Sequence, residues 1–88
     1  IRISIPKLSE ERREELIHLM KQKLENGRIM VRQVRHEAMS DIRKRQNDKS
    51  ISEDEGERME KEVQKVTDEL MAEIEVMGKK KEEELLTI

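Results

Sequence analysis

Apolar residues recur every three or four positions over most of the chain, which is the period of an α-helix with one apolar face. The pattern fades at Gln46, Asn47 and Asp48, where polar residues follow one another. The spacing predicts two long helices, over residues 9–46 and 52–86, joined by a short turn. The apolar row of the first helix consists of Leu16, Met20, Leu24, Gly27, Val31, Val34 and Ala38, and that of the second of Met59, Val63, Val66, Leu70, Ile74, Met77 and Leu85.

Both predicted helices have a start signal. Ser9 is followed by two glutamates, which suit the positive end of a helix dipole, and Ser52 with Glu55 three residues on has the spacing of a capping box. The opening IRISIP alternates apolar and polar residues before Pro6, as a half-buried strand does. Residues 1–8 are therefore predicted to be extended.

The short turn makes the two helices antiparallel neighbours, so the predicted fold class is all-α, a long antiparallel helical hairpin. Met30 and Ile17 widen the first apolar row, and the face is broader than one partner helix would cover. We expect a third helix to cover it, from a missing part of the chain or from a second copy. Gly27 lies within the row, either because a neighbour approaches closely or as a tolerated imperfection.

The composition changes this picture little. The 88 residues are 45% charged and 33% hydrophobic, with no cysteine and no aromatic residue, which indicates one small domain without disulfides. The net charge of −2 does not favour nucleic acid, so any such footprint must be local. Neither a signal peptide nor a run long enough to cross a bilayer is present in the sequence, and we expect a soluble, cytoplasmic protein without membrane contact.

Arg28, Arg32 and Arg35 fall at i, i+4 and i+7, so they share one side of the helix, about a quarter turn from the apolar row. Guanidinium groups at one-turn intervals on a rigid helix suit phosphate oxygens. The commoner alternative is a solvated row, or pairing with carboxylates such as Glu25 or Glu37. No catalytic constellation or metal-ligand spacing appears in the sequence, so we expect neither enzymatic activity nor a cofactor.

The segments SEERR, VRQVR and SEDEGERMEKEVQKVTDEL, in this order, resemble the C-terminal half of bacterial ribosome recycling factors over essentially the whole chain. The resemblance implies an L-shaped protein with a three-helix bundle and a second, β-rich domain. The hairpin at residues 9–88 would be the second and third helices of the bundle, and residues 1–8 the linker returning from the second domain. The missing third helix would then be the family's N-terminal one.

The same resemblance implies the function. With elongation factor G, the family splits post-termination ribosomes into subunits. Arg13, Arg32 and Arg35 match family arginines that contact large-subunit rRNA. Arg28 extends the arginine row, but its match to the family is weaker. His36 stands where related sequences often carry another arginine, so that contact is in doubt, or depends on pH near 6.5.

Other interpretations remain open at this point. The chain, as a piece of a longer protein, is expected to self-associate through its exposed apolar faces. It could instead be a helical oligomerisation module in which the arginines pair with glutamates, without RNA binding. A helix that binds another RNA or a membrane surface is a further alternative, although the absence of aromatic side chains disfavours base stacking and interfacial anchoring.

Overall fold

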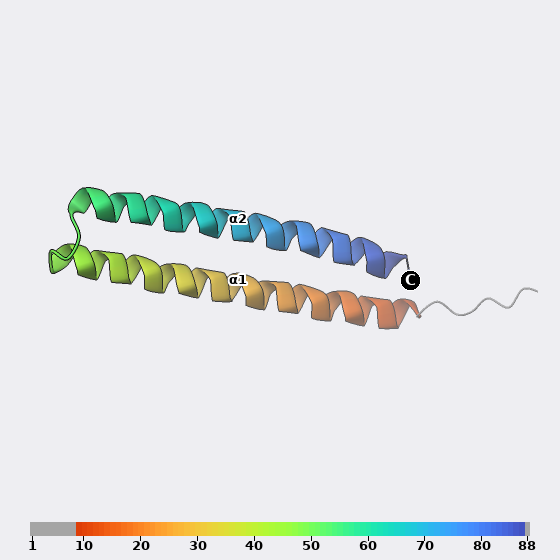
Figure 1. Ribbon diagram of the computed structural model, residues 1–88. Helices are drawn as coiled ribbons and strands as arrows, with labels where there is room; N and C mark the ends of the chain where they lie inside the picture. Colours follow the sequence, from red (N-terminus) through yellow and green to blue (C-terminus); the bar gives the residue numbers. More distant parts are fainter. Residues whose placement is uncertain (1–8, 88) are drawn as a thin grey trace, which may run out of the picture.

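The structure, a computed structural model, describes residues 9–87, which form two long antiparallel helices joined by a short turn. α1 spans Glu10–Asn47 and α2 spans Glu53–Leu86, and they lie side by side along nearly their whole length (Figure 1). At about 1.5 Å per residue, α1 extends about 57 Å. The helix bounds agree with the prediction to within one residue, and the all-α hairpin is confirmed. The extended segment predicted over residues 1–8 lies outside the described residues.

Serine side chains cap the start of both helices, as predicted. The Ser9 hydroxyl oxygen accepts the Arg12 backbone N–H at 3.1 Å, and that of Ser52 accepts the Glu55 N–H at 3.0 Å. The Glu55 carboxylate in turn accepts the Ser52 hydroxyl at 3.3 Å. Such caps satisfy N–H groups that have no partner within the helix, and each stabilises by roughly 1 kcal/mol.

The turn between the helices is held by its own side chains. One carboxylate oxygen of Asp48 accepts both the backbone N–H of Ser50, at 3.0 Å, and the Ser50 hydroxyl, at 2.5 Å. These hydrogen bonds, the one from the hydroxyl foremost, hold the pKa of Asp48 below its usual value. Lys49 takes a left-handed conformation, with φ at 64°, and the chain reverses there.

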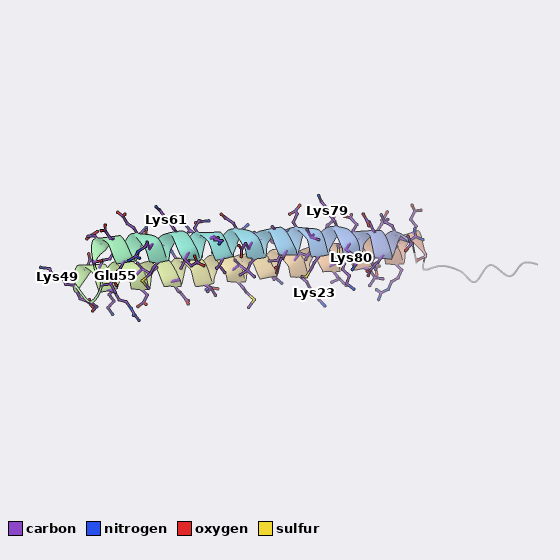
Figure 2. The ribbon with its side chains drawn as sticks, turned by 45° about the horizontal axis from the view of Figure 1, so that its top comes forward. Lys23, Lys49, Glu55, Lys61, Lys79 and Lys80 are labelled. Carbon is purple, nitrogen blue, oxygen red and sulfur yellow. The ribbon has the colours of Figure 1, made fainter. Side chains whose placement is uncertain are left out.

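Among the described residues, the buried apolar side chains lie in the part of α1 nearest the turn, and a buried threonine lies near the middle of α2. Met39 and Ile42 are only 8% and 3% exposed, and Thr67 of α2 is buried with its hydroxyl donating to the Val63 carbonyl at 2.7 Å. The rest of the seam is half-buried, and charged side chains such as Lys23, Lys61 and Lys79 project outward from the two helices (Figure 2). Two helices alone therefore leave much of their apolar surface in contact with water.

Small residues on α2 let the helices approach each other. A Cβ atom on Gly78 would stand 2.7 Å from Leu24 Cδ1, and one on Gly56 would overlap the Gln46 side chain. At Gly27 the nearest atom, Ile74 Cδ1, would be at 3.8 Å, an ordinary contact distance. The interpretation of Gly27 as a point of close approach is thus wrong for this pair of helices, and Gly78 has that role instead.

Because α1 packs against one flank of α2, the centre of the apolar row of α2 stays uncovered. Val66 and Leu70 are 43% and 41% exposed, and Val34 on α1 is 64% exposed. Between them runs a groove of about 470 Å³. We call it the apolar groove; its apolar lining includes Val31, Val34 and Ala38 of α1 and Val63, Val66 and Leu70 of α2. This is the broad apolar face that the sequence predicted.

Candidate nucleic-acid interface

The members of the arginine row lie differently with respect to the apolar groove: Arg35 itself lines the groove, whereas Arg32 faces away from its most exposed part. At about 100° per residue, Arg32 and Val34 are about 160° apart round the helix, so one faces away while the other lines the groove. The same helix therefore carries exposed apolar residues on one side and Arg32 on the other, with Arg35 between them. The three arginines nevertheless have different surroundings.

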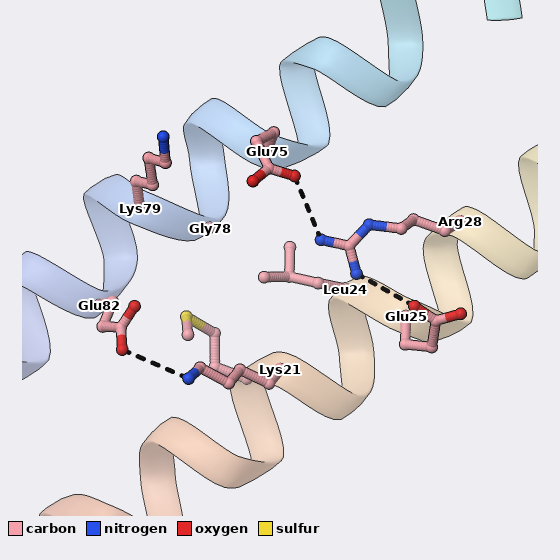
Figure 3. A pocket seen from close by; sticks show the side chains of 9 residues that line it. Lys21, Leu24, Glu25, Arg28, Glu75, Gly78, Lys79 and Glu82 are labelled. Atoms are coloured by element: carbon pink, nitrogen blue, oxygen red, sulfur yellow. Dashed lines mark hydrogen bonds and ion pairs between the residues drawn. The ribbon is translucent and has the colours of Figure 1, made fainter. Parts of the chain in front are cut away.

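Arg28 joins the two helices. One guanidinium nitrogen lies 3.1 Å from the Glu25 carboxylate on α1, and the other lies 3.7 Å from the Glu75 carboxylate on α2. Figure 3 shows this bridge beside Gly78, where Leu24 reaches across toward α2. The Arg28 side chain is only 26% exposed, so most of it belongs to the interhelical contact.

Arg32 is the most solvent-exposed of the three arginines. Its side chain is 57% exposed, and it pairs with the same glutamate, Glu25, at 3.2 Å. Glu25 thus lies between two guanidinium groups. Hydrogen bonds from Arg32 and then Arg28 hold the pKa of the Glu25 carboxyl below its usual value, so it stays ionised near neutral pH. The predicted alternative of pairing with Glu25 is therefore present in the structure.

Arg35 points toward α2 and is half-buried. Its Nε donates to the Gln64 side-chain oxygen at 2.8 Å, and the Gln64 amide nitrogen donates to the Asp68 carboxylate at 2.9 Å. Gln64 carries no charge, so this hydrogen bond does not set an opposite charge against the guanidinium group of Arg35. Sequence analysis missed Gln64, because periodicity within one helix does not show which residue of the other helix lies opposite.

The two remaining predicted residues lie outside the row. Arg13 is half-buried and lies 19 positions before Arg32, about 28 Å along α1. His36 is exposed on the outer side of α1, one turn beyond Arg32, where it lines a hollow of about 350 Å³. The structure therefore brings Arg28, Arg32 and Arg35 together, sets His36 next to them, and leaves Arg13 apart.

A second group of cations lies between His36 and the turn, and sequence analysis missed it. Arg43 and Lys44 line the same hollow as His36. Their spacing from His36, seven and eight residues, was the signal that could have revealed them.

Among residues 9–87, no cluster of three or more His, Cys, Asp or Glu side chains suited to a metal ion is found. Neither helix in this range is apolar enough along its length to cross a membrane.

The fold and its surfaces define an elongated all-α protein with a cationic side and an apolar groove along one helical rod. The sequence model of the family described as "Ribosome recycling factor" matches residues 1–86. The chain belongs to the ribosome recycling factor family.

Curated relatives agree with this assignment. A ribosome-recycling factor of Francisella philomiragia subsp. philomiragia is 40% identical over all 88 residues, which cover 48% of that relative. One of Francisella tularensis subsp. novicida is 38% identical over the same span, also 48% of its length. The chain thus spans about half the length of these relatives. No solved structure matches the chain.

Proposed function

We propose that this chain acts as part of a ribosome recycling factor and docks on large-subunit rRNA through the arginine side of α1. Arg32 and Arg35 are the principal contacts, with Arg28, Arg13 and His36 as further ones. Together with elongation factor G, the whole protein separates post-termination ribosomes into subunits in the cytoplasm, and no covalent bond changes in the factor itself. Family membership supports the recycling role.

The exposure and charge of Arg32 carry the proposal for RNA binding. Its side chain is 57% exposed, and the side chain of its partner Glu25 is 50% exposed. Exposed ion pairs of this kind contribute little, typically below about 1 kcal/mol, so an incoming phosphate can replace the carboxylate. A helix fixed by packing against α2 holds the guanidinium groups at one-turn intervals, which fits contact with a phosphate backbone rather than the reading of base sequence.

The apolar groove supports a bundle of three helices in the whole protein. Its exposed valines and leucines would need an apolar partner along the rod. The curated relatives are about twice as long as this chain, which leaves ample sequence for another helix and a second domain. In this arrangement residues 1–8 are the linker to the second domain and the hairpin is part of a rigid anchor.

The test compares binding of the full-length protein to isolated large subunits at several salt concentrations. Arg32→Ala combined with Arg35→Ala should weaken binding and flatten the dependence of log affinity on log salt by about 0.7–0.9 per lost phosphate contact. Arg12→Ala is the matched control, because Arg12 is 53% exposed, is paired with Glu15 and lies about 160° round α1 from Arg32. Unchanged affinity in the double variant, with helicity preserved, would refute the docking surface.

A second candidate, a helical interaction module without RNA binding, is favoured by the bridge from Arg28 to Glu75 between the helices. If the arginine row serves mainly to hold the helices together, Arg28→Glu and Glu75→Arg should each destabilise the folded hairpin. The double variant, in which both charges are reversed, should regain stability. The expected coupling for such a partly exposed pair is about 0.2–1 kcal/mol. This result combined with normal subunit binding by the Arg32 and Arg35 variant would favour the second candidate.

A further inference from the structure

We propose that the hollow formed by His36, Arg43 and Lys44 on the outer side of α1 is a second phosphate-binding site, which extends the arginine row toward the turn. The inference rests on the proposed RNA-binding function and adds contacts that the arginine row does not include. The ligand of this site is the sugar-phosphate backbone of RNA. We call this site the turn-proximal hollow.

The turn-proximal hollow continues the arginine row along the same helix. His36, Ser40, Arg43 and Asn47 recur at four-, three- and four-residue steps, so they form one strip along α1, and Arg32 lies one turn before it. The concavity measures about 350 Å³. The side chains that line it are His36, Met39, Ser40, Arg43, Lys44 and Asn47.

The charge of this lining distinguishes the hollow from the one beside Arg28. There, three cations face three carboxylates: Lys21, Arg28 and Lys79 against Glu25, Glu75 and Glu82. Figure 3 shows two of these cations bound to glutamates across the seam, Arg28 to Glu75 and Lys21 to Glu82. The turn-proximal hollow is lined by two cations, an imidazole, a hydroxyl and an amide, and its lining contains no carboxylate. Its lining therefore carries a net positive charge, and Glu60 of α2, which lies outside the lining, approaches Arg43.

Carboxylates near the hollow hold its cations only weakly. Glu60 of α2 lies 3.8 Å from Arg43 Nε, at the outer limit of an ion pair, and the Arg43 side chain is 71% exposed. Asp41, on the neighbouring turn, pairs with Arg45 at 3.1 Å and not with a residue of the hollow. Arg43 can therefore turn toward an incoming anion without giving up a strong contact.

A phosphate group fits the donors that line this hollow. The Arg43 guanidinium group and the Lys44 ammonium group supply charge-assisted hydrogen bonds, and Ser40 and Asn47 supply neutral donors to the remaining oxygens. The chain has no Phe, Tyr or Trp side chain on which a base could stack, so contact is expected mainly with the backbone. Arg32 and Arg43 are 11 positions apart, about 16 Å along the helix, so they would meet different phosphates of a bound RNA.

The experiment uses the full-length protein and isolated large ribosomal subunits, with Arg43→Ala combined with Lys44→Ala. We expect weaker binding. The ratio of wild-type to variant affinity should fall roughly threefold per lost phosphate contact when the salt concentration rises from 50 to 200 mM. Arg45→Ala is the matched control: Arg45 is 54% exposed, adjoins Lys44 in sequence and lies about 160° round the helix from Arg43. The control should bind as wild type does. If the double variant lost helicity, the single Arg43→Gln variant would carry the test.

Three outcomes would overturn the inference. If the Arg43 and Lys44 variant binds as wild type while the Arg32 and Arg35 variant does not, the hollow is not an RNA site and the proposed function stands. If neither variant loses affinity, both the inference and the proposed docking surface fail. If the loss appears only when elongation factor G is added, the hollow contacts an acidic protein surface instead of RNA.

Discussion

Gly27 and Gly78 face the same seam from opposite helices, yet replacing each by alanine should affect stability differently. At Gly27 the new Cβ would lie 3.8 Å from Ile74 Cδ1, an ordinary contact, so the variant should gain about 1 kcal/mol of helix propensity. At Gly78 it would lie 2.7 Å from Leu24 Cδ1, which must move. Overpacking costs about 1–3 kcal/mol, here toward the low end because the end of a leucine side chain can rotate.

We therefore expect Gly27→Ala to stabilise by about 1 kcal/mol, and Gly78→Ala to range from neutral to about 1 kcal/mol destabilising. For a chain of this size, 1 kcal/mol corresponds to about 4–8 °C in Tm. Urea and thermal unfolding followed by circular dichroism, each at two protein concentrations, measure the difference and reveal any association.

Leu24→Ala in the Gly78→Ala background is the control, because it removes the methyl group that the new Cβ would meet. The penalty of Gly78→Ala should disappear in that background. If Gly78→Ala stabilises as much as Gly27→Ala with Leu24 in place, the close approach of the helices at Gly78 is refuted.

Three further predictions concern single side chains. Glu25→Gln should tighten binding to large subunits, because it releases Arg32. Folding lowers the pKa of Glu25, so its ionised carboxylate stabilises the fold above about pH 4.5, and this stabilisation is lost as the pH falls through the lowered value. Acid should therefore reduce the stability of wild type more than that of the variant, as followed by circular dichroism. The 88-residue chain alone should self-associate through the apolar groove, and Val66→Glu, but not the outward-facing Lys65→Glu, should reduce its mass in light scattering; a monomeric wild type would contradict this. Ser52→Ala should lower stability by about 1 kcal/mol through loss of the cap of α2, and an unchanged Tm would count against that cap.

The helices and their starts could be predicted because the determinants are local. A serine followed by acidic residues satisfies N–H groups within one turn, and apolar periodicity depends only on the spacing within a single helix. Ser9 and Ser52 accordingly begin the helices in the structure as the sequence indicated. Local signals of this kind do not depend on which partner a helix later meets.

The relative rotation of the helices could not be predicted, because it depends on both partners at once. The apolar row of α2 does not indicate which part of it meets α1; in the structure α1 packs on the flank where Gly56, Thr67 and Gly78 are buried. Small side chains at these positions allow the backbones to approach, and the larger apolar residues then line the groove. A spacing rule counts apolar positions but does not weigh how near another helix can come.

The same limit explains why three similar arginines have different roles. Their shared spacing predicted one row, and only the position of α2 shows that Arg28 bridges to Glu75 while Arg35 bonds to Gln64. Redirecting either toward a phosphate breaks a contact between the helices, whereas redirecting Arg32 breaks an exposed pair within α1. Arg32 is therefore the member of the row that can engage an RNA backbone at the least cost to the fold, and the effect of its removal on binding should be the most independent of stability.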